Sequence, residues 1–126
     1  MKNLAELVGA QLLSFGSGGF TVRMPDMEVR SFRYVQDEGD CCGFNSLDTT
    51  LLINRDELRN NPVITAVHQV REDGGEADSL MVTFFGLDRK LAEINSFSSS
   101  GSGWCYGATV SLECMETSDN LVLTSY

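Results

Sequence analysis

The sequence predicts one α+β domain that is mainly β, an antiparallel meander sheet of about seven strands with one or two short helices. Three observations lead to this fold class. Most stretches alternate apolar and polar residues or are rich in β-branched and aromatic residues, and spacers rich in Gly, Asp or Ser separate them. Helix signals occur at only two short places. A length of 126 residues is that of a single domain, covering residues 1–126.

The first expected element is a short helix at residues 4–8. Asn3 can cap it, and Glu6, three residues later, completes the pattern of a capping box. Gly9 follows the last residue of this segment. Because glycine readily leaves helical geometry, the helix is expected to end there.

The next elements are strands. Residues 11–15 and 20–24 flank the turn Gly16-Ser17-Gly18-Gly19 and are expected to form a hairpin. Residues 28–36 give a third strand, and the β-branched residues 49–53 give a short fourth one.

A single helical turn is expected at residues 55–59. Asn54 can cap its start, Asp56 and Glu57 lie in its first turn, and Arg59 lies near its end. These charges complement the helix dipole. Asn60-Asn61-Pro62 follows and stops the helix.

The second half of the chain reads as strands. Residues 63–71 and 79–87 flank an acidic hairpin loop at 72–78, and residues 90–97 continue the meander. The strand at 79–87 is largely apolar on both faces, so it is expected to be central.

The clearest amphipathic strand is expected at residues 104–115, after a Ser/Gly loop at 98–103, and a last strand can form at 121–125. Alternation places one set of residues on a single face of the strand at 104–115. This set is Trp104, Tyr106, Ala108, Val110, Leu112 and Cys114.

The charge is strongly negative. Eighteen acids against nine bases give a formal net charge of −9 and a pI near 4.4. Direct binding of nucleic acid is disfavoured, because that affinity comes mostly from cations that neutralise phosphates. An acidic chain can instead approach a basic protein surface, or compete with nucleic acid for one. The alternative meaning of the acidity is solubility alone.

No targeting segment and no apolar run of membrane-spanning length is visible, so we expect a cytoplasmic protein without a membrane partner. Its four cysteines are then expected to be reduced. Dimerisation through an exposed edge strand stays open.

Chemistry at the cysteines is disfavoured. The adjacent Cys41 and Cys42 point apart in extended backbone, and Cys105 and Cys114 differ by an odd number, so the four thiols do not form the spaced pairs of a zinc site. His68 is the only histidine available as a base. We therefore expect no metal, no cofactor and no catalytic residue, and we expect Cys114 to join the core.

The candidate binding residues lie in two acidic loops and beside the Ser/Gly loop. Acidic clusters of this kind are commonly solvated loop charge, and neither matches a calcium loop. A loop next to aromatic residues is a common recognition arrangement. The candidates are Asp37, Glu38 and Asp40; Glu72, Asp73, Glu76 and Asp78; and Trp104 and Tyr106.

Four features together carry a resemblance: Leu7-Val8-Gly9, Asp40-Cys41-Cys42 after a strand, a short helix before Asn61-Pro62-Val63-Ile64, and a late hairpin whose Ser/Gly turn leads into an aromatic strand. The chain resembles a family of small β-rich domains of unknown function from bacteriophages and actinobacteria, marked by an Asp-Cys-Cys motif. The family often has Glu after the cysteines, where this chain has Gly43. The resemblance implies a phage-like context and an accessory role in the host cytoplasm, and it transfers no catalytic residue.

The leading hypothesis is a non-enzymatic, phage-related protein that binds a host protein with a basic surface, in an accessory, anti-defence or nucleic-acid-mimic role. The alternative is binding or hydrolysis of a nucleotide-like small ligand in a pocket near Trp104 and Tyr106. That alternative requires Arg30, Arg33 or His68 to lie near the two aromatic residues.

Overall fold

The structure, a computed structural model, describes residues 1–38, 43–99 and 108–126. Within these residues the chain forms nine strands, one short α-helix and one 3-10 helix, which confirms the mainly β class. In chain order the elements are η1 (Leu4–Leu7), β1 (Gln11–Phe15), β2 (Gly19–Arg23), β3 (Val29–Asp37), β4 (Phe44–Leu51), α1 (Arg55–Arg59), β5 (Ala66–Asp73), β6 (Ala77–Phe85), β7 (Lys90–Ser99), β8 (Thr109–Cys114) and β9 (Asn120–Ser125).

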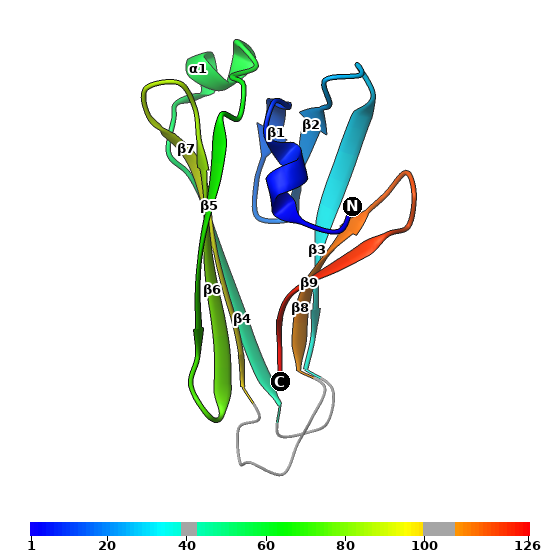
Figure 1. The fold of residues 1–126 in the computed structure, drawn as a ribbon, viewed down its shortest axis with the longest axis vertical. Coiled ribbons are helices and arrows are strands. Elements are labelled where there is room, and N and C mark those ends of the chain that lie inside the picture. The colour runs from blue at the N-terminus through cyan, green and yellow to red at the C-terminus, as the bar shows by residue number, and fades with distance from the viewer. Residues whose placement is uncertain (39–42, 100–107) are drawn as a thin grey trace.

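The strands form two antiparallel sheets that lie face to face (Figure 1). Sheet A is five-stranded with the order β1-β2-β3-β8-β9, and sheet B is four-stranded with the order β4-β7-β6-β5. The chain leaves sheet A after β3, builds sheet B, and returns to sheet A as β8. In sheet B the meander β5-β6-β7 is completed by β4 beside β7, which is a Greek key.

The expected single meander of about seven strands is therefore corrected. Consecutive strands are neighbours from β1 to β3, from β5 to β7 and in the β8–β9 hairpin, while the pairs β3–β8 and β4–β7 join distant segments. The physical reason is burial. An apolar sheet face must be covered, and here each sheet covers the other.

The core fills the space between the two inner faces. Phe20 of β2 and Phe84 of β6 meet across it with ring centroids 5.6 Å apart, and Phe32 stacks on Phe20 at 5.0 Å. The helix η1 lies beside the two sheets (Figure 1), and its Leu4 and Leu7 side chains are buried in the core between them. Its capping box is present as expected, with Asn3 and Glu6 as partners.

Backbone hydrogen bonds tie the two sheets together beside α1. The Gly9 amide donates to the Ile64 carbonyl at 2.7 Å, and the Leu12 amide donates to the Pro62 carbonyl at 2.9 Å. The segment before β5 is thereby fixed to the edge of β1, with an isolated bridge between Gln11 and Val63. This contact fixes where β5, the edge strand of sheet B, begins.

Most expected elements of sheet B are present with shifted ends. The helix α1 has the expected bounds, and β6 lies between β5 and β7 as expected. The strand β4 begins at Phe44, five residues before the expected start. The acidic hairpin loop is shorter than expected, because β5 runs to Asp73 and β6 starts at Ala77. None of the helices in the described part of the chain is long and apolar enough to cross a membrane.

Candidate functional site

The outer face of sheet B is exposed to solvent and carries acidic side chains. Alternation explains how it arises: Leu80 and Val82 of β6 and Ile94 of β7 are buried in the core, so the residues between them point away from it. Strand pairing then places the outward residues of β4, β7, β6 and β5 in rows that cross the sheet.

Three of these rows cover the middle of the face. Each is given in the strand order β4, β7, β6, β5. The rows are Ser46, Phe97, Ser79 and Glu72; Asp48, Asn95, Met81 and Val70; and Thr50, Glu93, Thr83 and His68. They contain three carboxylates, and none of their members is a lysine or an arginine. The face therefore carries a local negative charge beside apolar side chains.

A hollow of about 290 Å³ lies within the first two rows, and we call it the cross-strand hollow. Met81, Phe97 and Val70 give it apolar walls, and Val70 is 40% exposed. Asp48 lies at its β4 side and Glu72 at its β5 side. Neighbouring strands are about 4.8 Å apart, so three spacings separate these two strands by about 14 Å.

The two carboxylates at the ends of the hollow are available to a partner. Among the described residues, neither Asp48 nor Glu72 forms an ion pair. Glu93, in the third row, accepts a hydrogen bond from the Asn95 side chain at 3.1 Å. The acids that do form ion pairs lie elsewhere in the molecule, so the outer face keeps its charge.

Charge also differs between the two ends of sheet B. Because β6 runs from one end to the other, the β5–β6 turn and the β6–β7 turn lie at opposite ends (Figure 1). The first turn carries Glu72, Asp73 and Glu76. Arg89 and Lys90 lie at the second, where Arg89 forms an ion pair with Glu57 of α1. A cationic partner is thus attracted toward the end with the β5–β6 turn.

The structure separates one candidate acid from the others. Glu72, Asp73 and Glu76 are exposed, whereas Asp78 is only 7% exposed. Arg71 Nη1 donates to both carboxylate oxygens of Asp78, each at 2.8 Å, and the Ser125 amide donates to Asp78 Oδ2 at 3.1 Å. Asp78 therefore joins sheet B to β9 and is not part of the exposed acidic surface.

The end of β3, where the other predicted acidic loop begins, lies at the same end of the molecule as the β5–β6 turn (Figure 1). Asp37 ends β3, and Glu38 follows it; both are exposed. Asp40, Trp104 and Tyr106 lie outside the described residues. Sequence reasoning missed Asp48 and Glu93 as surface acids, although alternation along β4 and β7 places both on the outer face.

The basic residues required by the alternative hypothesis are dispersed. Arg30 lies on the same side of β3 as the buried Phe32, whereas Arg33 lies on the opposite side and pairs with Glu113 at 2.7 Å. His68 lies on the outer face of sheet B, where its ring packs edge-on against Phe85 at 6.4 Å. The three side chains do not converge on one pocket.

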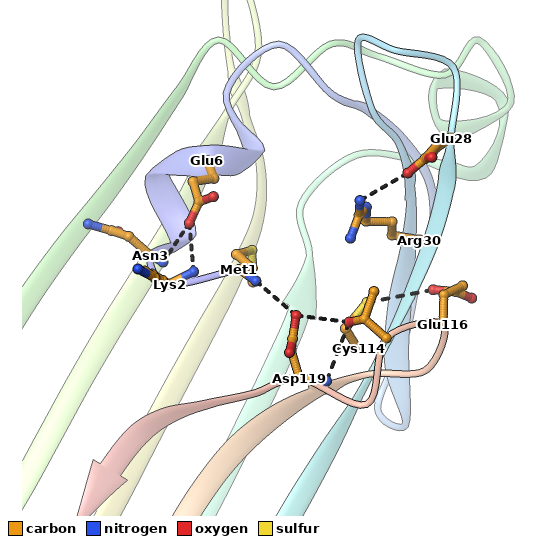
Figure 2. A network of polar contacts seen from close by, with 10 residues as sticks. Met1, Lys2, Asn3, Glu6, Glu28, Arg30, Cys114, Glu116 and Asp119 are labelled. Carbon is orange, nitrogen blue, oxygen red and sulfur yellow. Dashed lines mark hydrogen bonds and ion pairs between the residues drawn. The ribbon is translucent and has the colours of Figure 1, made fainter.

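Cys114 is buried in the core, as expected. Figure 2 shows its thiol directed at Glu116, with Sγ 3.7 Å from Oε1, and Glu116 also accepts the Ser31 amide at 2.7 Å. Arg30 pairs with Glu28 nearby at 2.9 Å. This network holds the β8–β9 turn against β3. The other three cysteines, Cys41, Cys42 and Cys105, lie outside the described residues. The residues that are described contain no group of three metal-ligating side chains.

A larger hollow of about 470 Å³ lies between α1 and the β6–β7 turn. Its walls include Ile53, Pro62, Val63 and Leu91, and Leu87 at its rim is 93% exposed. It is mostly apolar, and the charges at its edge already form ion pairs with one another. This hollow could therefore hold an apolar group, but none of the described charged side chains at its edge is free to orient a ligand.

Comparison of the chain with protein families, with curated proteins and with solved structures found no match.

Proposed function

We propose that this protein is a non-enzymatic binding protein that engages the basic surface of another protein through the outer face of sheet B. The observation that supports the proposal is the composition of the three rows. Asp48, Glu72 and Glu93 lie among apolar side chains, with no lysine or arginine in the same rows. Of these apolar side chains, Val70 is exposed, and Met81 and Phe97 are half-buried. A face of one charge sign favours partners of the opposite sign and steers their approach.

The chemistry of this face favours a protein partner. Its carboxylates repel phosphates, so nucleic acid is a poor ligand for it. Protein interfaces combine an apolar centre with a polar rim, and here Met81, Phe97 and Val70 lie between the acids. A partner bound in this way would lose access of its basic surface to nucleic acid. This consequence agrees with the host-directed, phage-related role that the family resemblance implies.

The experiment compares two variants of equal net charge. The face variant combines Asp48→Asn, Glu72→Gln and Glu93→Gln, and the control variant combines Asp26→Asn, Asp56→Asn and Asp88→Asn, which all lie outside the three rows. Binding to poly-L-lysine is measured at low and high salt, and two-dimensional NMR of the unmodified protein maps the contact. Circular dichroism and thermal melting verify that both variants are folded.

We expect the face variant to lose at least fivefold more affinity for poly-L-lysine than the control variant. In the NMR spectra, the chemical-shift changes should concentrate on the strands β4 to β7 of sheet B. High salt should weaken binding in every case, because the contact is electrostatic. Equal losses in the two variants, or shifts spread over the whole surface, would show that net charge alone is responsible and would overturn the proposal.

A further inference from the structure

The cross-strand hollow has a defined length and a defined order of chemical groups. From β4 to β5 it presents a carboxylate, an apolar middle and a second carboxylate, contributed by Asp48, by Met81 with Phe97, and by Glu72. A ligand that satisfies all three parts must carry a cation, an apolar group and a cation in that order. Asp48 and Glu72 are three strand spacings apart, about 14 Å, and are also offset by two residues along the strands, about 7 Å. Their backbones are therefore about 16 Å apart, and the two cations of the ligand must cover that diagonal.

An extended peptide meets this requirement with a simple sequence pattern. Its residues advance about 3.3 Å each, so the backbones of residues i and i+4 are about 13 Å apart. The long, flexible stems of Lys and Arg cover the remaining few Å to the two carboxylates. Residues i, i+2 and i+4 also point to the same side of an extended chain. We propose that the cross-strand hollow binds an extended segment of a partner protein with Lys or Arg at i and i+4 and an apolar residue at i+2. This inference rests on the proposed function and names the feature of the partner that is recognised.

The walls of the hollow suit the stems of such side chains. The methylene groups of Lys and Arg pack on apolar surface while their charged ends reach polar groups. Met81 is adaptable in shape and Phe97 is flat, so the two can cover the side chain at i+2. Ser79 and Asn95 lie between them and make room for it.

Other occupants fit less well. A helix places residues i and i+4 only about 6 Å apart, so Lys or Arg at those positions would not reach both Asp48 and Glu72. A strand added to the open edge of β5 would run along sheet B and leave Asp48, three strands away, without a contact. A linear polyamine shares the spaced cations but lacks an apolar group larger than its own methylenes.

The test uses two pentapeptides of identical composition and charge, both capped at their ends. One has the order Lys-Ser-Leu-Ser-Lys and the other Lys-Lys-Leu-Ser-Ser. Affinities are measured by NMR titration at low salt with the full chain, and spermidine serves as a third ligand. The variants are Asp48→Asn, Glu72→Gln and Met81→Ser, with Glu76→Gln as the matched control, because Glu76 is exposed but lies outside the hollow.

We expect the spaced peptide to bind at least threefold more tightly than the shuffled peptide and than spermidine, with shifts centred on Met81 and Phe97. Exposed ion pairs are weak, so Asp48→Asn and Glu72→Gln should each cost about two- to fivefold in affinity for the spaced peptide. Glu76→Gln should leave that affinity within about 1.5-fold. Met81→Ser should reduce the preference for the spaced peptide without changing the salt dependence.

Equal affinities for the two peptides would overturn this inference, and tighter binding of spermidine would identify a polyamine as the occupant instead. These results are distinguishable from failure of the proposed function. If the affinity for poly-L-lysine still depends on Asp48, Glu72 and Glu93 while the two pentapeptides bind equally well, the proposed function stands and the further inference is wrong. If neither probe depends on those acids, both fall.

Discussion

Arg71 and Asp78 form an ion pair that joins the two sheets. Arg71 Nη1 lies 2.8 Å from both carboxylate oxygens of Asp78, and Arg71 Nη2 donates to the Leu123 carbonyl of β9 at 2.8 Å. The Ser125 amide donates to the same carboxylate. The pair therefore connects the edge strand β5 with β9, which belongs to the other sheet, and links the candidate binding face to the rest of the molecule.

The first prediction concerns this pair. Asp78→Ala should lower the free energy of unfolding by about 1.5–3 kcal/mol, the range for hydrogen bonds to a charged group. The loss stays below that of a fully buried pair because Arg71 is about half exposed and can turn to solvent. Urea denaturation measures it. The control is Asp73→Ala, whose exposed carboxylate lies directly across the hairpin and should change stability by less than about 0.5 kcal/mol.

The second prediction concerns three buried hydroxyl groups between the sheets. Thr124 Oγ1 of β9 lies 2.7 Å from Ser96 Oγ and 2.9 Å from Ser98 Oγ of β7. Thr124→Val should lower the free energy of unfolding by about 1–3 kcal/mol, because it leaves both serine hydroxyls buried without this partner. The triple variant that adds Ser96→Ala and Ser98→Ala should cost less than the sum of the three single changes. Strict additivity would contradict the network.

Local signals predicted the short elements of this fold well. The bounds of α1 follow from Asn54, whose side chain accepts the Glu57 amide at 2.8 Å, and from the charges on either side of it. The η1 capping box is equally local, with Glu6 accepting the Asn3 amide at 2.9 Å. Each signal lies within four residues of its effect, so a single sequence contains it completely.

The division into two sheets could not be predicted in this way. The strand β4 pairs along its full length with β7, which lies about fifty residues later in the chain. Its first residues include the polar Asn45 and Ser46, so a run of β-branched residues does not mark where it begins. The burial of Asp78 could have been found, because it alternates in register with Leu80, Val82 and Phe84. The cross-strand hollow needs the order of all four strands, which no local pattern contains.

The third prediction concerns the hydroxyl group of Tyr34. Its oxygen is buried and has no hydrogen-bond partner among the described residues. Burial raises the pKa of this phenol, so it stays protonated. Tyr34→Phe should leave the free energy of unfolding unchanged or raise it by up to about 1 kcal/mol, because it removes an unpaired buried polar group and keeps the ring. A loss of more than about 1 kcal/mol would indicate a hydrogen bond, for example to a buried water.

The fourth prediction concerns acid pH and the N-terminal segment. Hydrogen bonds from the Lys2 and Asn3 amides lower the pKa of Glu6, and the Thr117 hydroxyl, followed by the Met1 amino group, lowers the pKa of Asp119. Each carboxylate therefore contributes stability above its ordinary pKa of about 4, and that contribution is lost as the pH falls through the lower pKa of the folded state. The protection of the Ala5 and Leu7 amides against hydrogen exchange, measured relative to their intrinsic exchange rates at each pH, should therefore fall below about pH 4.

The control for that prediction is Glu6→Gln. The amide keeps an acceptor oxygen for the backbone donors but does not titrate in this range, so the protection of the Ala5 amide should no longer fall as the pH is lowered. An unchanged pH profile in this variant, or a midpoint above the ordinary pKa of a glutamate, would refute the assignment to Glu6.

The last prediction concerns the close approach of β2 to β3. A Cβ atom added to Gly19 would lie 1.9 Å from the Phe32 carbonyl oxygen, and that oxygen belongs to a backbone paired on both sides. Gly19→Ala should lower the free energy of unfolding by about 3 kcal/mol or more, because the paired strand cannot move aside. Gly18→Ala is the matched control, since nothing lies within 4 Å of its added Cβ. The melting temperature of that control should be close to that of the unmodified protein. Similar losses of stability in both variants would mean that the turn, not the contact with Phe32, requires glycine.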